Sequence, residues 1–348
     1  MNGEIKKLVI LHADHYEPNG NGIIVDGNKK TTDEYVKRKM DMFESLDWSV
    51  NRVKPTLFVH LPMSVNNRLG KMEIIVNKKT ELMLEHLKNL KKVGIDDIQV
   101  HIHHENWTNN DVFKRNNPGH VPIETDQDRL GKFIKLHRTL LAENGLQVFS
   151  DPWFFVHGKW ALNAADTEIC SIEDEIKVLY KLGCRGDFTF PAGRKSYDPI
   201  TKNAMLMNPN LTGRMCYNTV NNISVNKNID PKMFFIYNQS LPVQYASIEH
   251  IVKSKREGGI KNNEFINMWL LHSISINGVN YIKTHCHSMN DIFFLNEDKT
   301  DFRKNCDTPL MSEEYRGLLK QLQDKCTKLG IELQYQTIKD FYNANVGK

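Results

Sequence analysis

Short runs rich in β-forming residues alternate with amphipathic helical patterns along most of this chain. The predicted strands cover residues 8–14, 56–62, 98–103, 153–157, 184–190, 233–237, 243–247, 279–287 and 332–336. The predicted helices cover residues 32–46, 80–93, 125–144, 171–183, 262–273 and 312–329. Because alternating strands and helices build βαβ units, this order predicts a mostly parallel sheet. We expect an α/β fold, a distorted (β/α) barrel, in a single domain over residues 1–348.

One long stretch does not follow this alternation. Residues 193–230 are rich in Asn, Pro and Gly and carry no sustained periodicity. Loops of this length are uncommon in compact domains, and they are usually functional or mobile. We therefore predict a long irregular insertion at about 193–230 that shapes a substrate site.

Polar side chains gather where the predicted strands end, most densely at residues 101–105 (His-Ile-His-His-Glu). Because side chains alternate between the faces of a strand, His101 and His103 point the same way. A turn after them can bring Glu105 back to that side. Imidazole and carboxylate groups are costly to bury unless they are paired or bind a metal. Asp14 ends the first strand, so we predict a divalent metal site on Asp14, His101 and one further ligand. That ligand is either His103 or Glu105.

Further candidates lie near other strand ends. They are His12, His15, His60, His157, Trp160, Arg185, His285 and His287. Barrel enzymes place their chemistry at the C-terminal ends of the strands. Arg185 can orient a catalytic carboxylate or bind an anionic substrate group. His285 and His287 share a face, and one of them is a candidate general acid. We expect His157 and Trp160 to bind substrate, since an aromatic face suits a sugar ring.

Composition argues against several other classes of protein. The net charge is only +4, and the basic runs at 88–92 and 253–256 are typical of solvated helix faces, so we expect no nucleic-acid partner. The six cysteines form no CxxC pair, which argues against a zinc knuckle or a disulfide framework and favours a cytoplasmic location. We expect no membrane span, because no apolar stretch is long enough. The sequence leaves the oligomeric state open.

The order of these motifs resembles that of the polysaccharide deacetylase superfamily, the NodB-homology domain. The matching motifs are Asp14, residues 101–105, Arg185 with the segment 188–191, and residues 281–285 (Tyr-Ile-Lys-Thr-His). Residues 156–162 (Val-His-Gly-Lys-Trp-Ala-Leu) are similar to a His-Gly-Asn-Trp-Ala-Leu motif of a divergent branch associated with surface-polysaccharide biosynthesis. The resemblance spans roughly residues 7–290.

This resemblance implies a distorted (β/α) barrel that holds one divalent metal ion, often zinc, with an aspartate and two histidines. It implies hydrolysis of an N- or O-acetyl group on a sugar. The family's metal-binding aspartate matches Asp14, and its first metal-binding histidine matches His101. Its arginine matches Arg185, and its general acid matches His285. Glu105 stands where the family usually has its second histidine.

Two departures from the family pattern bear on the mechanism. The family's first motif has two adjacent aspartates, one a base and one a ligand, whereas Asp14 is flanked by Ala13 and His15. Either His15 takes one of these roles or the mechanism differs. Glu105 in place of a histidine adds an oxygen ligand, which shifts the metal preference from zinc towards manganese, iron or magnesium.

We therefore predict a metal-dependent hydrolase that removes an N-acetyl or other acyl group from a sugar or a sugar-containing precursor. One alternative is another metal-dependent barrel hydrolase, of the amidohydrolase or phosphoesterase type. Such enzymes usually carry His-x-His on the first strand, whereas here it is on the third. The other alternative is a non-catalytic, deacetylase-like protein of a glycan pathway, which the missing second aspartate favours.

Overall fold

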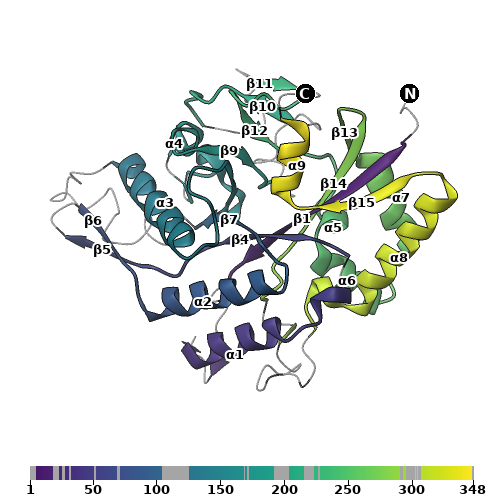
Figure 1. Ribbon diagram of the computed structural model, residues 1–348, viewed down its shortest axis with the longest axis horizontal. Helices are drawn as coiled ribbons and strands as arrows, with labels where there is room; N and C mark the ends of the chain where they lie inside the picture. Colours follow the sequence, from purple (N-terminus) through teal and green to yellow (C-terminus); the bar gives the residue numbers. More distant parts are fainter. Residues whose placement is uncertain are drawn as a thin grey trace. The chain divides into compact units, whose positions relative to one another are not determined.

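Figure 1 presents the computed structural model of the chain. The structure describes residues 5–18, 23–25, 28–30, 33–50, 52–68, 71–103, 125–167, 169–170, 172–191, 204–214, 223–225, 228–290, 293–294, 302, 304 and 307–346.

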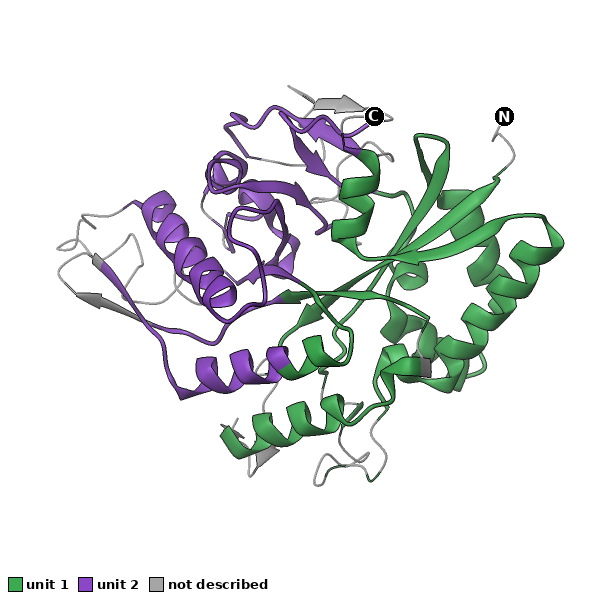
Figure 2. Ribbon diagram, in the orientation of Figure 1, with its two compact units in different colours: residues 1–58, 89–97, 239–345 green, residues 59–88, 98–238, 346–348 purple. Residues whose placement is uncertain are grey.

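The chain forms two compact units, each assembled from three separate segments of sequence (Figure 2). Unit 1 comprises residues 1–58, 89–97 and 239–345, and unit 2 comprises residues 59–88, 98–238 and 346–348. Both units contain parallel strands and helices, so the predicted α/β class with mostly parallel strands is confirmed. The closed barrel, its deacetylase-like topology and the single domain stay predictions.

Unit 1 is organised around β1 (Lys7–Tyr16), which is buried along nearly its whole length. β1 pairs in parallel with β14 (Val279–Cys286) and with β15 (Glu332–Gln336), and β4 (Pro55–Val59) is also its neighbour. β13 (Ile274–Ile276) runs antiparallel to β14. Figure 1 shows the yellow β15 beside the purple β1, so segments from the two ends of the sequence share one sheet. A strand covered on both faces is nearly continuous in apolar residues, which explains the run at 8–11.

Helices complete unit 1. They are α1 (Asp33–Glu44), α5 (Val243–Ala246), α6 (Ile248–Arg256), α7 (Asn262–His272), α8 (Glu313–Lys328) and α9 (Ile338–Asn345), with 3-10 turns at Trp48–Val50 and Pro309–Met311 and a hairpin of β2 (Ile23–Val25) and β3 (Asn28–Lys30). The sequence predicts α8 well because both of its ends carry signals. Ser312 accepts a hydrogen bond from the Tyr315 N–H (3.2 Å), and Gly330 follows with a φ of 68°.

Unit 2 has its own run of strands, in the order β7, β8, β9, β12, β10, β11. Their bounds are β7 (Asp97–Ile102), β8 (Trp153–His157), β9 (Cys184–Asp187), β12 (Phe234–Ile236), β10 (Met205–Met207) and β11 (Ile223–Val225). The first four strands pair in parallel, and β10 and β11 add antiparallel pairs. The unit also contains a hairpin of β5 (Ser64–Arg68) and β6 (Lys71–Ile75), and the helices α3 (Asp126–Glu143) and α4 (Glu175–Lys181). The helix α2 (Lys78–Lys92) is divided, with residues 78–88 in unit 2 and its last turn in unit 1.

The core of unit 2 lies between α3, α4 and the strands. Phe133, Trp153, Phe155 and Leu179 belong to one buried cluster there. Burying each such side chain contributes about 1.5–3 kcal/mol, so this cluster fixes the helices against the sheet. Thr125 starts α3 with a capping box to Asp128, as the predicted helix at 125–144 requires.

Two predictions about elements were wrong, and a third was right in type but wrong about where the element begins. The predicted strand at 243–247 is the helix α5, because Pro242 stands at its N-cap and Ser247 already caps α6. The helix predicted at 171–183 begins at Glu175 with Asp174 as its N-cap, and Ser171 lies outside the described residues. The stretch predicted as irregular at 193–230 includes the short strands β10 and β11 in its described part.

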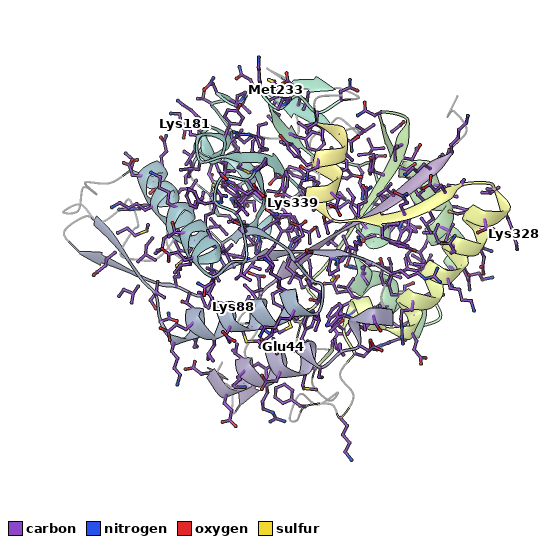
Figure 3. All side chains as sticks on the ribbon, viewed as in Figure 1. Glu44, Lys88, Lys181, Met233, Lys328 and Lys339 are labelled. Atoms are coloured by element: carbon purple, nitrogen blue, oxygen red, sulfur yellow. The ribbon has the colours of Figure 1, made fainter. Side chains whose placement is uncertain are left out.

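Basic residues near helix C-termini extend away from the ribbon, as Lys181 of α4 and Lys328 of α8 do in Figure 3. Both side chains are exposed, and their charge stabilises the carbonyl end of the helix. Among the described residues, no helix combines the length and apolar character needed to cross a membrane.

Candidate functional site

Two histidines meet at the C-terminal end of β7 in unit 2. His101 is buried, His103 is partly exposed, and their Nε2 atoms lie 3.0 Å apart. His101 Nδ1 lies 2.8 Å from the Val156 carbonyl oxygen, which can only accept, so Nδ1 carries the proton. The lone pair of His101 Nε2 therefore faces His103. This is the arrangement of a metal-binding histidine whose other nitrogen is held by a backbone carbonyl.

The spacing of the two Nε2 atoms fits a shared metal ion. Zinc binds imidazole nitrogen at about 2.0–2.1 Å, so in tetrahedral geometry two neighbouring ligand atoms lie about 3.3 Å apart, close to the 3.0 Å seen here. Without an ion, the same spacing allows one imidazole to donate to the other. The donor set thus suits a divalent metal of the zinc type, and His103 is partly exposed.

Two further imidazoles surround this pair. His60 Nδ1 lies 3.3 Å from the His101 carbonyl oxygen, and its ring meets the His103 ring edge-on with centroids 5.7 Å apart. His137 of α3 is fully buried, and neither ring nitrogen has a hydrogen-bond partner among the described residues. Burial, followed by His60 and His101, lowers the pKa of His137 well below its usual value, so this ring is neutral. Sequence reasoning missed His137 because it lies inside a helix.

The segment that follows β8 has a strained backbone. Lys159 (φ 52°), Trp160 (φ 60°), Asn163 (φ 51°) and Ala164 (φ 58°) all lie in the left-handed region. This region costs a residue other than glycine about 1–2 kcal/mol. Such strain persists only where surrounding contacts impose it, and it concentrates at functional sites.

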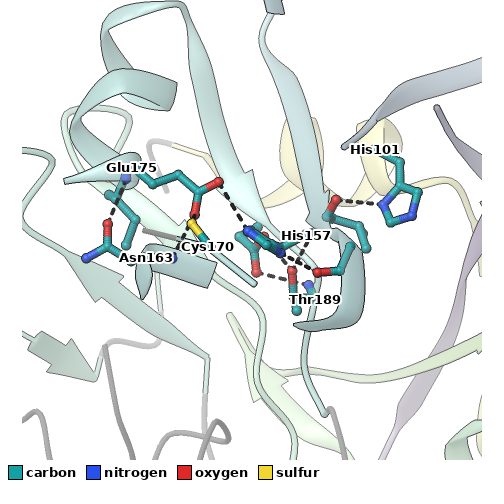
Figure 4. Close-up of polar contacts among 10 residues, drawn as sticks. His101, His157, Asn163, Cys170, Glu175 and Thr189 are labelled. Carbon is teal, nitrogen blue, oxygen red and sulfur yellow. Dashed lines mark hydrogen bonds and ion pairs between the residues drawn. The ribbon is translucent and has the colours of Figure 1, made fainter. Parts of the chain in front are cut away.

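A buried polar network imposes this conformation (Figure 4). Asn163 donates its backbone N–H to Glu175 Oε2 (2.7 Å). Its side-chain Nδ2 donates to the carbonyls of Glu173 and Gly213, at 2.8 Å each. Glu175 Oε1 lies 3.6 Å from His157 Nε2, and both side chains have an exposed fraction of 0%. Burial raises the pKa of Glu175 despite the nearby His157, so the pair is a costly feature that the fold retains.

Asp14 lies at the C-terminal end of β1 in unit 1. Its side chain is buried, Oδ1 accepts the Ser288 N–H at 3.1 Å, and Oδ2 has no hydrogen-bond partner among the described residues. Burial raises the pKa of Asp14 to about 7. A buried carboxylate oxygen without a hydrogen bond is costly unless it meets a proton or a cation, so Asp14 remains a good candidate ligand or base.

The β1–β14 register separates the unit 1 candidates onto two faces. Asp14 pairs with Cys286, whereas Ala13 pairs with His285, so Asp14 and His285 point to opposite faces of the sheet. His15 shares the face of His285, and its ring lies 6.0 Å from that of His285, centroid to centroid.

His287 follows two residues after His285, and Glu249 of α6 contacts it. Glu249 Oε1 lies 3.1 Å from His287 Nδ1 and also accepts the His287 N–H. Burial lowers the pKa of His287, but the contact with Glu249 outweighs it and the net shift is upward. Burial also lowers the pKa of His285, to about 3, so His285 is neutral near pH 7. His287 is therefore the better proton donor of the two.

Two other groups of donor atoms are sealed inside the units. They are His12, Asp14 and Cys286 in unit 1, and His157, Cys170 and Glu175 in unit 2, with the ligand atoms of each group within 4.8 Å of one another. All six residues are buried. Either group can hold an ion, but neither gives a substrate access to it.

Arg185 lies at the start of β9, where the register between β8 and β9 shifts. Its Nη1 donates to the carbonyls of Tyr180 (3.2 Å) and Cys184 (3.1 Å), and its guanidinium stacks on the Tyr180 ring at 4.6 Å. These contacts lie at the opposite end of the strand from the C-terminal edge. They favour a structural role, and the predicted catalytic role of Arg185 gains no support from them.

The remaining predicted residues are distributed as follows. Trp160 is partly exposed and packs on the unit 2 core, whereas His157 is fully buried, which favours a supporting role over contact with a substrate. Glu105 lies outside the described residues. Asp14 belongs to unit 1 and His101 to unit 2, so their joint ligation of one ion stays a prediction.

Comparisons with models of known protein families and with curated proteins find no match to this chain.

Proposed function

We propose that this chain is a metal-dependent hydrolase that removes an N-acetyl or other acyl group from a sugar or a sugar-containing precursor. The observation that carries the proposal is the His101–His103 pair. Its nitrogens lie 3.0 Å apart at a strand end, and one imidazole is fixed through its other nitrogen to a carbonyl. The motif order in the sequence, which resembles that of sugar deacetylases, supplies the substrate class.

His101 and His103 hold the metal ion in this proposal. Zinc is the first candidate because two imidazoles suit it, and manganese or iron becomes competitive if Glu105 or Asp14 adds oxygen. A bound ion of this kind acidifies water and polarises the acyl carbonyl. The sequence assigns the base to Asp14 or His15, and that role stays a prediction.

Of the two histidines that the sequence offers as the general acid, His287 suits the role better than His285. The neighbouring Glu249 keeps His287 protonated at higher pH, whereas burial keeps His285 neutral. Trp160, which is partly exposed, offers an aromatic face to a sugar ring.

The test is acetate release from a panel of N-acetyl and O-acetyl sugars, with the protein loaded in turn with zinc, manganese, iron or cobalt. His101→Gln and His103→Gln should each lower kcat/KM at least 100-fold. His272→Gln is the matched control, because its ring, at the end of α7, contacts Ser240 and belongs to neither histidine set. It should stay within threefold of the wild type.

Two results would reject the proposal. One is no acyl release from any sugar with any of the four metals. The other is acyl release that His101→Gln and His103→Gln leave unchanged. Metal-dependent release of phosphate from sugar phosphates, without acyl release, would favour the phosphoesterase alternative.

A further inference from the structure

The end of β8 contacts both candidate metal ligands. The Val156 carbonyl accepts from His101 Nδ1 at 2.8 Å, which sets the orientation of that ring. Two residues later, the backbone of Gly158 lies directly against the His103 ring. A Cβ atom at position 158 would stand 2.7 Å from His103 Cγ, 2.8 Å from His103 Nδ1 and 2.8 Å from the Ile102 carbonyl oxygen. The path of residues 156–158 therefore determines where both imidazoles lie.

Contacts of His157 hold the backbone of residues 156–158 in this conformation. Its N–H donates to Thr189 Oγ1 (2.9 Å), and its Nδ1 lies 2.5 Å from the Gly158 carbonyl oxygen. Its Nε2 faces Glu175 Oε1 at 3.6 Å, with both side chains fully buried. Glu175 Oε2 accepts the backbone N–H of Asn163, so the same carboxylate is hydrogen-bonded to one end of the left-handed turn and lies within ion-pair distance of His157 at the other (Figure 4).

We propose that His157 and Glu175 are positioning residues for the His101–His103 metal site: they hold the Gly158 backbone against the His103 ring, so that its Nε2 faces that of His101. This inference rests on the proposed function, since it assumes that the two histidines bind the metal. Outer contacts of this kind typically change metal affinity 10- to 100-fold. The motif at residues 156–162 thus positions the metal ligands, and its histidine, His157, does not contact substrate.

Cobalt(II) titration of the full chain, followed by visible absorption, tests the proposal because it reports affinity and ligand geometry without an activity assay. Gly158→Ala should weaken cobalt binding at least 10-fold and alter the spectrum, because the new methyl displaces the His103 ring and the Ile102 carbonyl beside it. Gly131→Ala is the matched control. It makes the same change within α3, where a Cβ meets nothing within 4 Å, and its affinity should stay within twofold of the wild type.

Glu175→Gln tests the anchor itself, since it removes the charge and keeps the shape. It should also weaken cobalt binding at least 10-fold, with circular dichroism showing a folded chain. Met207→Ala, in the buried strand β10, is the control for general loss of stability. It should lower the unfolding midpoint and leave cobalt affinity within twofold. If Glu175→Gln does not fold, Gly158→Ala decides.

Two outcomes overturn the inference, and they are distinguishable. If Gly158→Ala and Glu175→Gln bind cobalt like the wild type while His103→Gln does not, the positioning role is wrong and the metal site stands. If His101→Gln and His103→Gln themselves bind cobalt like the wild type, the metal site of the proposed function fails and the inference fails with it.

Discussion

Glu249 and His287 shift each other's protonation at the start of α6. Burial raises the pKa of Glu249, but the hydrogen bond and charge of His287 lower it to about 2, below its ordinary 4.5. A carboxyl with a lowered pKa stabilises the folded state above its unfolded pKa, and this stabilisation is lost as the pH falls through the folded value. His287, whose pKa is raised, contributes in the opposite direction, and its part is lost as the pH rises past its folded value.

The pair should therefore stabilise the fold most between about pH 4.5 and 6.5. Glu249→Gln should lower the free energy of unfolding by on the order of 2–3 kcal/mol at pH 5.5, and by clearly less at pH 3. Urea denaturation at the two pH values measures this difference. The control is Glu257→Gln, whose exposed pairing with Lys253 at 3.9 Å should contribute less than about 1 kcal/mol. An equal loss at both pH values would contradict the account.

Residues on a regular strand were the ones that sequence could predict. The alternation of a strand was enough to bring His101 and His103 together, and it also put His285 and His287 on one face. Glu249 could not be predicted this way. Residues 243–247 alternate like a strand, so the sequence did not indicate that the helix α6 begins at Ile248. His137 could not be predicted either, because its position near His60 depends on how the helix α3 packs.

The segment from His157 to Ala164 shows how one element can depend on a single side chain. Asn163 tolerates the left-handed region, and its amide satisfies two carbonyls and one N–H: those of Glu173, Gly213 and Ile176. The bond to Ile176 is buried and the other two are partly buried, and a buried donor or acceptor left without its partner costs about 1–3 kcal/mol. The segment should therefore lose its left-handed conformation when the Asn163 side chain is truncated.

Asn163→Ala should lower the free energy of unfolding by about 3 kcal/mol or more, because several buried groups lose their partners at once. Chemical denaturation of the full chain measures this loss. Asn144→Ala is the comparison, since its amide makes one half-buried bond to the Leu140 carbonyl at 2.8 Å and should cost about 1 kcal/mol. Equal effects of the two substitutions would show that the Asn163 network does not hold the segment.

Element types followed from local signals where caps and periodicity agreed, as in α3 and α8. The sequence did not predict the element type where a local signal was ambiguous. Short apolar runs such as 243–247 fit a strand or a helical turn, and only the caps at Pro242 and Ser247 decide. The strands β10 and β11 contain three residues each. β10 pairs with the edge of β12, and β11 pairs with β10, and no local window of sequence contains these partners.

At the scale of the molecule, both units are interleaved in sequence. Residues 98–238 of unit 2 lie between segments of unit 1, and β15 returns from the end of the chain to pair with β1. Sequence alternation correctly predicted parallel strands, but it carried no information about which segments group into a unit. Long-range pairings of this kind depend on packing of the whole chain.

The most direct measurement is the metal content of the purified, untagged protein by elemental analysis, beside His101→Gln, His103→Gln and Cys286→Ser. The account predicts about one equivalent of a transition metal in the wild type and in Cys286→Ser, which alters the sealed unit 1 cluster, and none in the two histidine variants. Metal retained in both histidine variants, or absent from the wild type after supplementation with zinc, manganese, iron and cobalt, would contradict it.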